Sequence, residues 1–116
     1  MQRLYPGVLW RKDQDRKVVY LTFDDGPRPE VTPWVLDTLD KYNAKATFFC
    51  IGKNVELFPE LFEEIKRRGH AVGNHSYSHV KGWGMSAGDY VMNIETANHL
   101  IKSSLFRPPY ARIGPN

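Results

Sequence analysis

Short apolar runs alternate with helical segments along this chain of 116 residues, and the alternation restricts the fold more than any other feature of the sequence. It predicts strands at residues 18–23, 46–51, 70–73 and 105–107 and helices at residues 32–42, 59–68 and 87–103. This pattern indicates an α/β fold with about four parallel strands, three helices and right-handed crossovers. A closed eight-stranded barrel needs about 250 residues, so any (β/α) barrel formed here is expected to be incomplete.

Particular residues predict where the helices begin and end. Thr32 is expected to be the N-cap of the first helix, with Pro33 at its first position. Ser86 and Asp89 predict a capping box ahead of the third helix. Gly69 follows the basic last turn of the second helix, as an αL cap does.

Composition places the chain among ordered globular proteins. Its residues are 41% apolar and 25% charged, and no run approaches the roughly 18 apolar residues of a membrane span. The net charge of +3 is spread along the chain, so no nucleic-acid partner is predicted. No signal peptide is expected, which leaves localisation open. Cys50 is the single cysteine and is predicted to be a buried core residue, because it cannot form an internal disulfide.

Two adjacent carboxylates, Asp24 and Asp25, follow the first predicted strand and precede a Gly26-Pro27 turn. Successive side chains on a strand point to opposite faces, so one carboxylate can bind a metal while the other moves a proton. In α/β proteins the carboxyl ends of strands usually carry the chemistry. The alternative is an Asp pair that only caps the turn, since Asp before Gly is ordinary turn chemistry.

Two histidines, His75 and His79, lie four residues apart after the third predicted strand. This spacing lets both imidazoles face one ion, whether the segment is a helix or a tight loop. Two histidines and one carboxylate suit a divalent transition metal that keeps positions open for water and substrate. The histidine pair alone is weak evidence, and the Asp pair strengthens it. The same set also describes the facial triad of a non-haem iron oxygenase, although the helix-alternating pattern argues against that class.

The third group of candidate residues follows the last predicted strand. Pro108 and Pro109 fix the backbone direction, so the N–H groups of Tyr110 and Ala111 are held where they could donate to an oxyanion. Arg107 could orient a neighbouring carboxylate. The alternative is a proline-rich connection with a solvated arginine.

These residues together resemble the NodB-homology polysaccharide deacetylases, also called the fourth carbohydrate esterase family. Residues 22–27, 75–79 and 107–110 match the three motifs of that family in order. The resemblance covers the chain from about Val18 to Tyr110 and implies an incomplete (β/α) barrel of the polysaccharide deacetylase type. Residues 1–17 look like a variable lead-in, and residues 1–116 are expected to form one truncated domain.

The resemblance implies a metal-dependent hydrolase that removes acetyl groups from N-acetylated glycans such as peptidoglycan or chitin. Asp24 would be the general base, Arg107 would hold Asp24, and the backbone N–H of Tyr110 would stabilise the oxyanion. The metal would be zinc, with cobalt, nickel or manganese as the other candidates. Its ligands would be Asp25, His75 and His79.

Contact with the glycan is expected at two further residues, Pro109 and Trp83. Trp83 lies between two glycines, where an exposed ring could stack on a sugar, although partly buried packing is the commoner role of such a ring. A family that often works at the cell envelope leaves both the cytoplasm and the envelope open as locations.

The chain also departs from the family pattern. The Leu-x-Leu-His motif that supplies the general acid is absent, and Ala111 stands where the family usually has Gly. Two functions therefore stay open: a deacetylase, either active or inactive in this truncated form, and a catalytically silent module that binds metal and glycan. An incomplete barrel leaves an open side, which predicts self-association into a homo-oligomer unless the chain is a fragment of a longer one.

Overall fold

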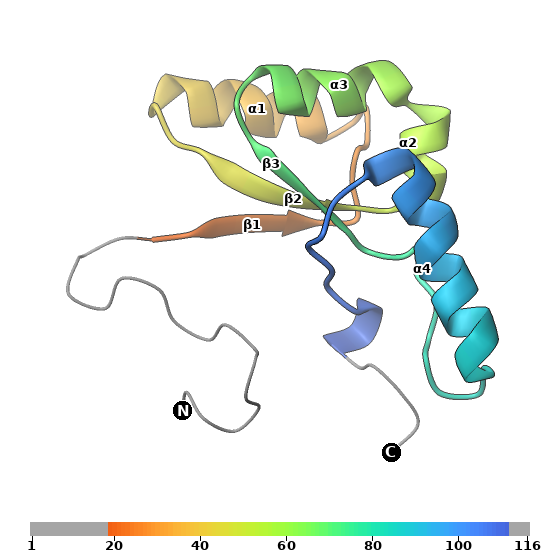
Figure 1. The fold of residues 1–116 in the computed structure, drawn as a ribbon. Helices are drawn as coiled ribbons and strands as arrows, with labels where there is room; N and C mark the ends of the chain where they lie inside the picture. The colour runs from red at the N-terminus through yellow and green to blue at the C-terminus, as the bar shows by residue number, and fades with distance from the viewer. Residues whose placement is uncertain (1–18, 112–116) are drawn as a thin grey trace.

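Three parallel strands form the centre of the structure, a computed structural model that describes residues 19–111 (Figure 1). The strands β1 (Leu21–Asp24), β2 (Ala46–Cys50) and β3 (Ala71–Asn74) lie in the order β1-β2-β3. The register places Asp24 at the end of β1 opposite Phe49 of β2. Because all three strands run in the same direction, their carboxyl ends meet at one edge of the sheet, as the α/β prediction requires.

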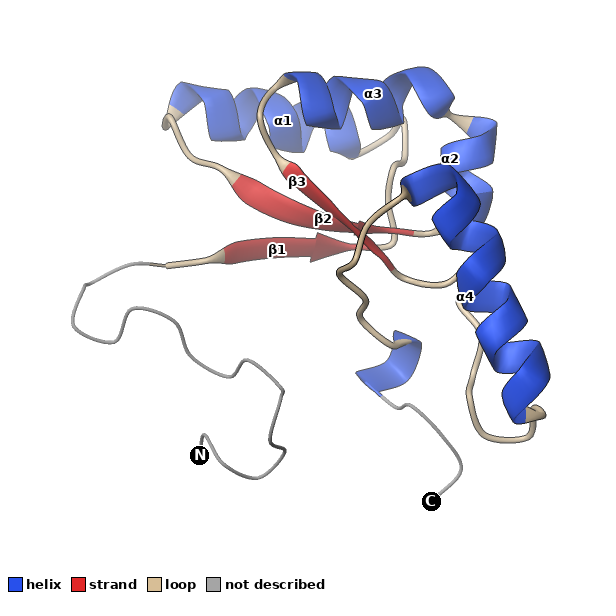
Figure 2. Ribbon diagram, in the orientation of Figure 1, coloured by secondary structure: helices blue, strands red, loops and turns tan. Residues whose placement is uncertain are grey.

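The described residues also form the helices α1 (Thr32–Lys41), α2 (Gly52–Leu57), α3 (Pro59–Arg67) and α4 (Ala87–Ile101) and the short 3₁₀ helix η1 (Pro109–Ala111). Figure 2 shows α1 and α3 across one face of the sheet, with α2 and α4 near the carboxyl ends of the strands. The α/β class with parallel strands is confirmed. The prediction of three helices is wrong by one, because α2 was not expected.

Helix α2 depends on contacts that no local sequence pattern shows. Its first backbone N–H groups, on Gly52 and Lys53, donate to the carbonyl oxygens of Ser76 and Tyr77, each at 2.9 Å. A helix of six residues gains little from its own propensity. The loop after β3 therefore supplies the acceptors that a capping side chain would otherwise provide.

The predicted fourth strand at residues 105–107 is wrong as a strand and survives as a single bridge. Phe106 pairs in parallel with Asn74, whose N–H donates to Leu105 O at 2.8 Å and whose carbonyl accepts from Arg107 N–H at 2.9 Å. The pairing stops there because the next two residues are prolines, which have no N–H to donate.

The core is formed by β2 together with residues of α1, α2, α3 and α4. The apolar side of α1 is buried, with Leu36 fully excluded from solvent. Cys50 is also fully buried, and burial raises the pKa of its thiol to about 12, in agreement with the predicted core role. The buried cluster consists of Val35, Leu36, Leu39, Ala46, Phe48, Cys50, Val55, Phe62, Ile65, Ala97 and Ile101.

Two predicted helix ends are confirmed and one is wrong. Ser86 Oγ accepts the N–H of Asp89 at 3.1 Å, and Gly69 has a φ of 90° after α3. Thr32 is not an N-cap, because α1 begins at Thr32 and Val31 holds the capping position. Its buried hydroxyl instead accepts the N–H of Arg28 at 2.8 Å, which ties the loop after β1 to α1.

His70 follows α3 and is buried. The residue is 5% exposed, and its Nδ1 accepts the N–H of Ala46 at 3.1 Å. It therefore serves as a buried acceptor at the start of β2. Two predicted strands differ in their bounds: β1 spans residues 21–24 instead of 18–23, and β3 spans residues 71–74 instead of 70–73. Residues 1–18 lie outside the described part of the chain.

The face of the sheet opposite α1 and α3 has no described helix over it (Figure 1). Side chains of Thr22, Asp24 and Phe49 belong to this face, because strand residues alternate and Phe23 and Phe48 point to the core. Self-association through this side stays a prediction. No helix in the described residues is long and apolar enough to cross a membrane.

Candidate metal centre

The turn after β1 presents Asp25 at the carboxyl edge of the sheet. Asp25 adopts a φ of 75°, a left-handed conformation that Asp tolerates better than most residues. Its N–H donates to Phe49 O at 3.2 Å, and its carbonyl accepts from the Asn54 side chain at 2.9 Å. The neighbouring Gly26 carbonyl accepts the N–H of Ile51 at 2.9 Å. The turn is thus fastened to the end of β2 and the start of α2.

The loop after β3 is a tight turn rather than a helix. His75 N–H donates to Cys50 O at 2.9 Å, and Ser76 and His79 both have positive φ values of 69° and 55°. Asn74, which is 2% exposed, holds the loop from below: its Oδ1 accepts Ser76 N–H at 2.8 Å and its Nδ2 donates to Ile94 O at 2.9 Å. Asn74 therefore shapes the histidine loop and ties it to α4.

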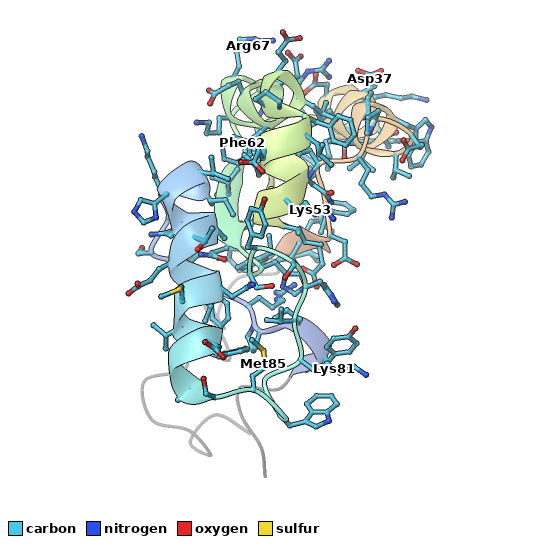
Figure 3. All side chains as sticks on the ribbon, turned by 90° about the vertical axis from the view of Figure 1, so that its right-hand side faces the viewer. Asp37, Lys53, Phe62, Arg67, Lys81 and Met85 are labelled. Atoms are coloured by element: carbon cyan, nitrogen blue, oxygen red, sulfur yellow. The ribbon has the colours of Figure 1, made fainter. Side chains whose placement is uncertain are left out.

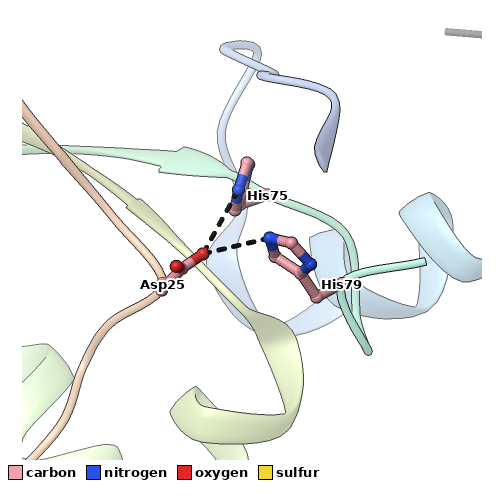
Figure 4. Close-up of side chains that lie close together, drawn as sticks. All are labelled: Asp25, His75 and His79. Carbon is pink, nitrogen blue, oxygen red and sulfur yellow. Dashed lines mark ion pairs between the residues drawn. The ribbon is translucent and has the colours of Figure 1, made fainter. Parts of the chain in front are cut away.

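Asp25, His75 and His79 converge on one point (Figure 4). Asp25 Oδ1 lies 3.4 Å from His75 Nε2 and 3.2 Å from His79 Nε2. One donor atom from each residue lies within 4.8 Å of the others. The predicted ligands are brought together although 54 positions separate the first from the last in the sequence, from residue 25 to residue 79.

The hydrogen bonding of His75 fits metal ligation. Its Nδ1 lies 2.7 Å from the carbonyl oxygen of Arg107, and a proton on Nδ1 donates to that oxygen. Nε2 then carries the lone pair and faces Asp25 Oδ1, which is the tautomer that a metal-binding imidazole uses. His75 is buried while Asp25 is half exposed, so the cluster opens to solvent on one side. The donor set suits a divalent transition metal with open coordination positions.

Arg107 contacts Asp24, as the sequence predicts. Its NH1 donates to Asp24 Oδ1 at 2.8 Å and to Thr22 Oγ1 at 3.0 Å. The guanidinium lies over the ring of Phe49, 4.3 Å from its centre. Neither Thr22 nor Phe49 was predicted to belong to the site, although the period of two along β1 places Thr22 on the same face as Asp24.

Gly73 explains how Phe49 fits beside the site. A Cβ on Gly73 would lie 2.5 Å from the Phe49 ring. Only a glycine on β3 therefore leaves room for the ring that supports Arg107.

The third motif places Tyr110 beside the histidine loop. Tyr110 and Ala111 have φ values of 60° and 55°, and the Tyr110 ring meets the His79 ring edge-on at 4.8 Å between centres. Ala111 N–H already donates to Pro108 O at 3.2 Å, which leaves Tyr110 as the predicted oxyanion donor. Pro109, a predicted substrate contact, is buried.

Trp83, the other predicted substrate contact, stands next to Tyr110. The two ring centres are 6.0 Å apart, and the rings are inclined at 73°. An open hollow of about 420 Å³ adjoins the candidate ligands Asp25 and His79. The hollow is lined by Asp25, Arg28, Glu30, Ile51, Asn54, Phe58 and His79.

The fold and the cluster define an α/β protein with a candidate metal centre at the carboxyl ends of its parallel strands. The chain belongs to the polysaccharide deacetylase family, whose model matches residues 11–116. It is 40% identical over 104 residues to a peptidoglycan-N-acetylglucosamine deacetylase of Bacillus cereus, covering 84% of this chain and 38% of that protein. The predicted resemblance is confirmed.

Two solved structures extend the comparison. The structure of the peptidoglycan deacetylase PdaC from Bacillus subtilis matches with a TM-score of 0.81 and 39% identity, over 90% of this chain and 54% of that one. A family 4 acetyl xylan esterase from Clostridium thermocellum, solved in complex with a cobalt ion, matches with a TM-score of 0.73 and 38% identity, over 83% and 50%. The incomplete barrel of the deacetylase type is therefore confirmed. The chain spans about half the length of these two solved chains and 38% of the length of the Bacillus cereus deacetylase.

Proposed function

We propose that this chain acts as a metal-dependent carbohydrate deacetylase on an N-acetylated glycan. The observation that carries the proposal is the meeting of Asp25, His75 and His79 beside an Asp24 that Arg107 holds at 2.8 Å. A metal site and a separate carboxylate that serves as general base are the two parts that amide hydrolysis by a metal-dependent deacetylase requires. The relatives are named for deacetylation of peptidoglycan, which supports an acetylated glycan as the substrate class.

Asp25, His75 and His79 would hold the metal, for which zinc is the first candidate and cobalt, nickel or manganese the others. When bound, such an ion lowers the pKa of water and polarises the amide carbonyl. Arg107 bonds Asp24 Oδ1, which leaves Asp24 Oδ2 to accept a proton from the attacking water. The N–H of Tyr110 would donate to the oxyanion of the acetyl group.

The broken C–N bond also needs a proton for the departing amine. His99 is exposed on α4, where its Nδ1 bonds Glu95 O at 2.8 Å, and His70 is buried beside Phe48. Neither histidine belongs to the metal cluster of the described residues. We therefore assign no described residue as the general acid.

Acetate release from tetra-N-acetylchitotetraose tests the proposal. The chain with added zinc or cobalt should release acetate, and Asp24→Asn should reduce the rate by about 10²- to 10⁴-fold, the usual contribution of a general base. Asp89→Asn is the matched control, because Asp89 is an exposed carboxylate on α4, and it should retain the rate.

Three results would count against the proposal. Equal rates for the Asp24→Asn variant and the unchanged chain would remove Asp24 from the reaction. Calorimetric binding of the oligosaccharide and zinc without any acetate release would favour the silent binding module instead. Oxygen uptake that depends on ferrous iron would support the oxygenase, which membership of the deacetylase family otherwise disfavours.

A further inference from the structure

A lysine ammonium lies in the corner between two exposed aromatic rings beside the metal centre. Lys81 Nζ lies 5.5 Å from the centre of the Trp83 ring and 5.4 Å from the centre of the Tyr110 ring. Figure 3 shows Lys81 near η1, at the end of the molecule away from Arg67 and Asp37. Because the two rings are inclined at 73°, the ammonium and the rings form a three-sided corner.

Ring contacts connect this corner to the candidate metal ligand His79. The His79 ring contacts Tyr110 at 4.8 Å between centres, and Tyr110 contacts Trp83 at 6.0 Å. The side chains remain accessible, with Tyr110 50% and Trp83 37% exposed. A sugar polymer whose acetyl group reaches His79 would therefore pass its next residue over these rings.

In the described part of the chain, no acid neutralises the charge of Lys81. Within residues 19–111, no carboxylate lies within ion-pair distance of its ammonium. Lys66 shows the contrast: it also lies over a ring, 4.7 Å from the centre of Phe62, but pairs with Glu63 at 2.9 Å. A cation–π contact positions an ammonium without cancelling its charge, so Lys81 can still attract an anion.

The hollow lined by Asp25 and His79 has no unpaired cation among its described lining residues. Its one arginine, Arg28, pairs with Glu30 at 3.6 Å, and both line the hollow. The two charges offset each other there. We therefore expect a negatively charged group of the glycan to bind at Lys81, beside Trp83 and Tyr110, and not in the hollow.

We propose that Lys81, Trp83 and Tyr110 form a subsite for a glycan residue that bears a carboxylate, adjacent to the residue that loses its acetyl group. The inference rests on the proposed function and narrows its substrate class. The apolar face of a sugar would stack on an aromatic ring while its carboxylate pairs with Lys81. N-acetylmuramic acid carries such a carboxylate on its lactyl group, whereas chitooligosaccharides carry none.

Binding of two oligosaccharides of equal length tests the subsite. Calorimetry would compare a tetrasaccharide of alternating N-acetylglucosamine and N-acetylmuramic acid with tetra-N-acetylchitotetraose, using the whole zinc-loaded chain. The unchanged chain should bind the anionic tetrasaccharide about fivefold more tightly, which corresponds to about 1 kcal/mol for a favourable exposed ion pair. Added salt should reduce that preference.

Variants at Lys81 separate charge from packing. Lys81→Met should bind both tetrasaccharides equally, and Lys81→Arg should keep the preference. Lys41→Met is the matched control, because Lys41 also lies over an aromatic ring, 5.6 Å from the centre of Tyr42, but on α1; it should keep the preference.

The outcomes distinguish the two proposals. Binding of the neutral tetrasaccharide with no preference for the anionic one, or a preference that persists in Lys81→Met, would overturn the subsite and leave the deacetylase standing. Failure to bind either tetrasaccharide would overturn the subsite and count against the proposed function as well.

Discussion

At the scale of single residues, His70 is a buried base that folding keeps neutral. Its Nδ1 accepts the N–H of Ala46, while its Nε2 is buried without a hydrogen-bond partner among the described residues. Burial lowers the pKa of His70, and the positive charges of Lys45 and Arg68 lower it further against the opposite effect of Asp40. Protonation of His70 is therefore less favourable in the folded chain than in the unfolded one.

This lowered pKa predicts a loss of stability in acid. The unfolded chain binds a proton on His70 near the ordinary pKa of about 6.5, whereas the folded chain resists it. The free energy of unfolding should thus be highest, as far as His70 is concerned, above about pH 6.5, and it should fall as the pH drops below that value. Urea unfolding of the metal-free chain between pH 5 and pH 8 would measure it.

Two substitutions isolate the contribution of His70 to this pH dependence. His70→Asn cannot titrate and keeps an oxygen that can accept the Ala46 N–H, so its unfolding free energy should vary less with pH below 6.5. His99→Asn removes an exposed histidine and should leave the dependence unchanged. If His70→Asn and the unchanged chain lost stability in parallel, the buried-base explanation would be wrong.

At the scale of elements, the close approach of α2 to α4 depends on Gly52. A Cβ at Gly52 would lie 2.9 Å from the Cα of Ala97 and 2.8 Å from the Tyr77 ring. The Ala97 atom is backbone and cannot swing aside. The start of α2 is therefore packed against α4 as closely as a glycine permits, next to the loop that carries His75 and His79.

Gly52→Ala should destabilise the fold by about 1–3 kcal/mol, the usual cost of overpacking. Gly88→Ala is the matched control, because Gly88 lies near the start of α4 with nothing within 4 Å of an added Cβ. It should stabilise the chain by about 0.5–1 kcal/mol through helix propensity. Denaturant unfolding would show both changes, and a Gly52→Ala variant as stable as Gly88→Ala would contradict the packing argument.

At the scale of the whole molecule, the candidate metal ligands Asp25, His75 and His79 lie together beyond the ends of β1 and β3. A ligand that binds only the folded chain stabilises it, by about 2.7 kcal/mol at a concentration one hundred times its Kd. Zinc should therefore raise the Tm by several degrees, and His79→Ala should remove most of that rise. His99→Ala should respond to zinc like the unchanged chain. An equal rise in Tm for His79→Ala would show that zinc binds elsewhere.

The candidate ligands could be predicted from the sequence because each lies at the end of an apolar run, and parallel strands bring such ends to one edge. Asp25, His75 and His79 meet there as expected. The positioning roles of Thr22, Phe49 and Asn74 could not be predicted in this way. They depend on Arg107, Gly73 and Ile94, residues that are distant in sequence from the side chains they contact.

Period, turn chemistry and residue type are local properties, and they were enough to predict the α/β alternation and the three candidate ligand positions. The existence of α2, the burial of His70 and the pairing of Phe106 with Asn74 became evident only from tertiary contacts. Each of these follows from backbone donors and acceptors that find partners more than twenty residues away. Such pairings depend on the completed sheet and have no local signal.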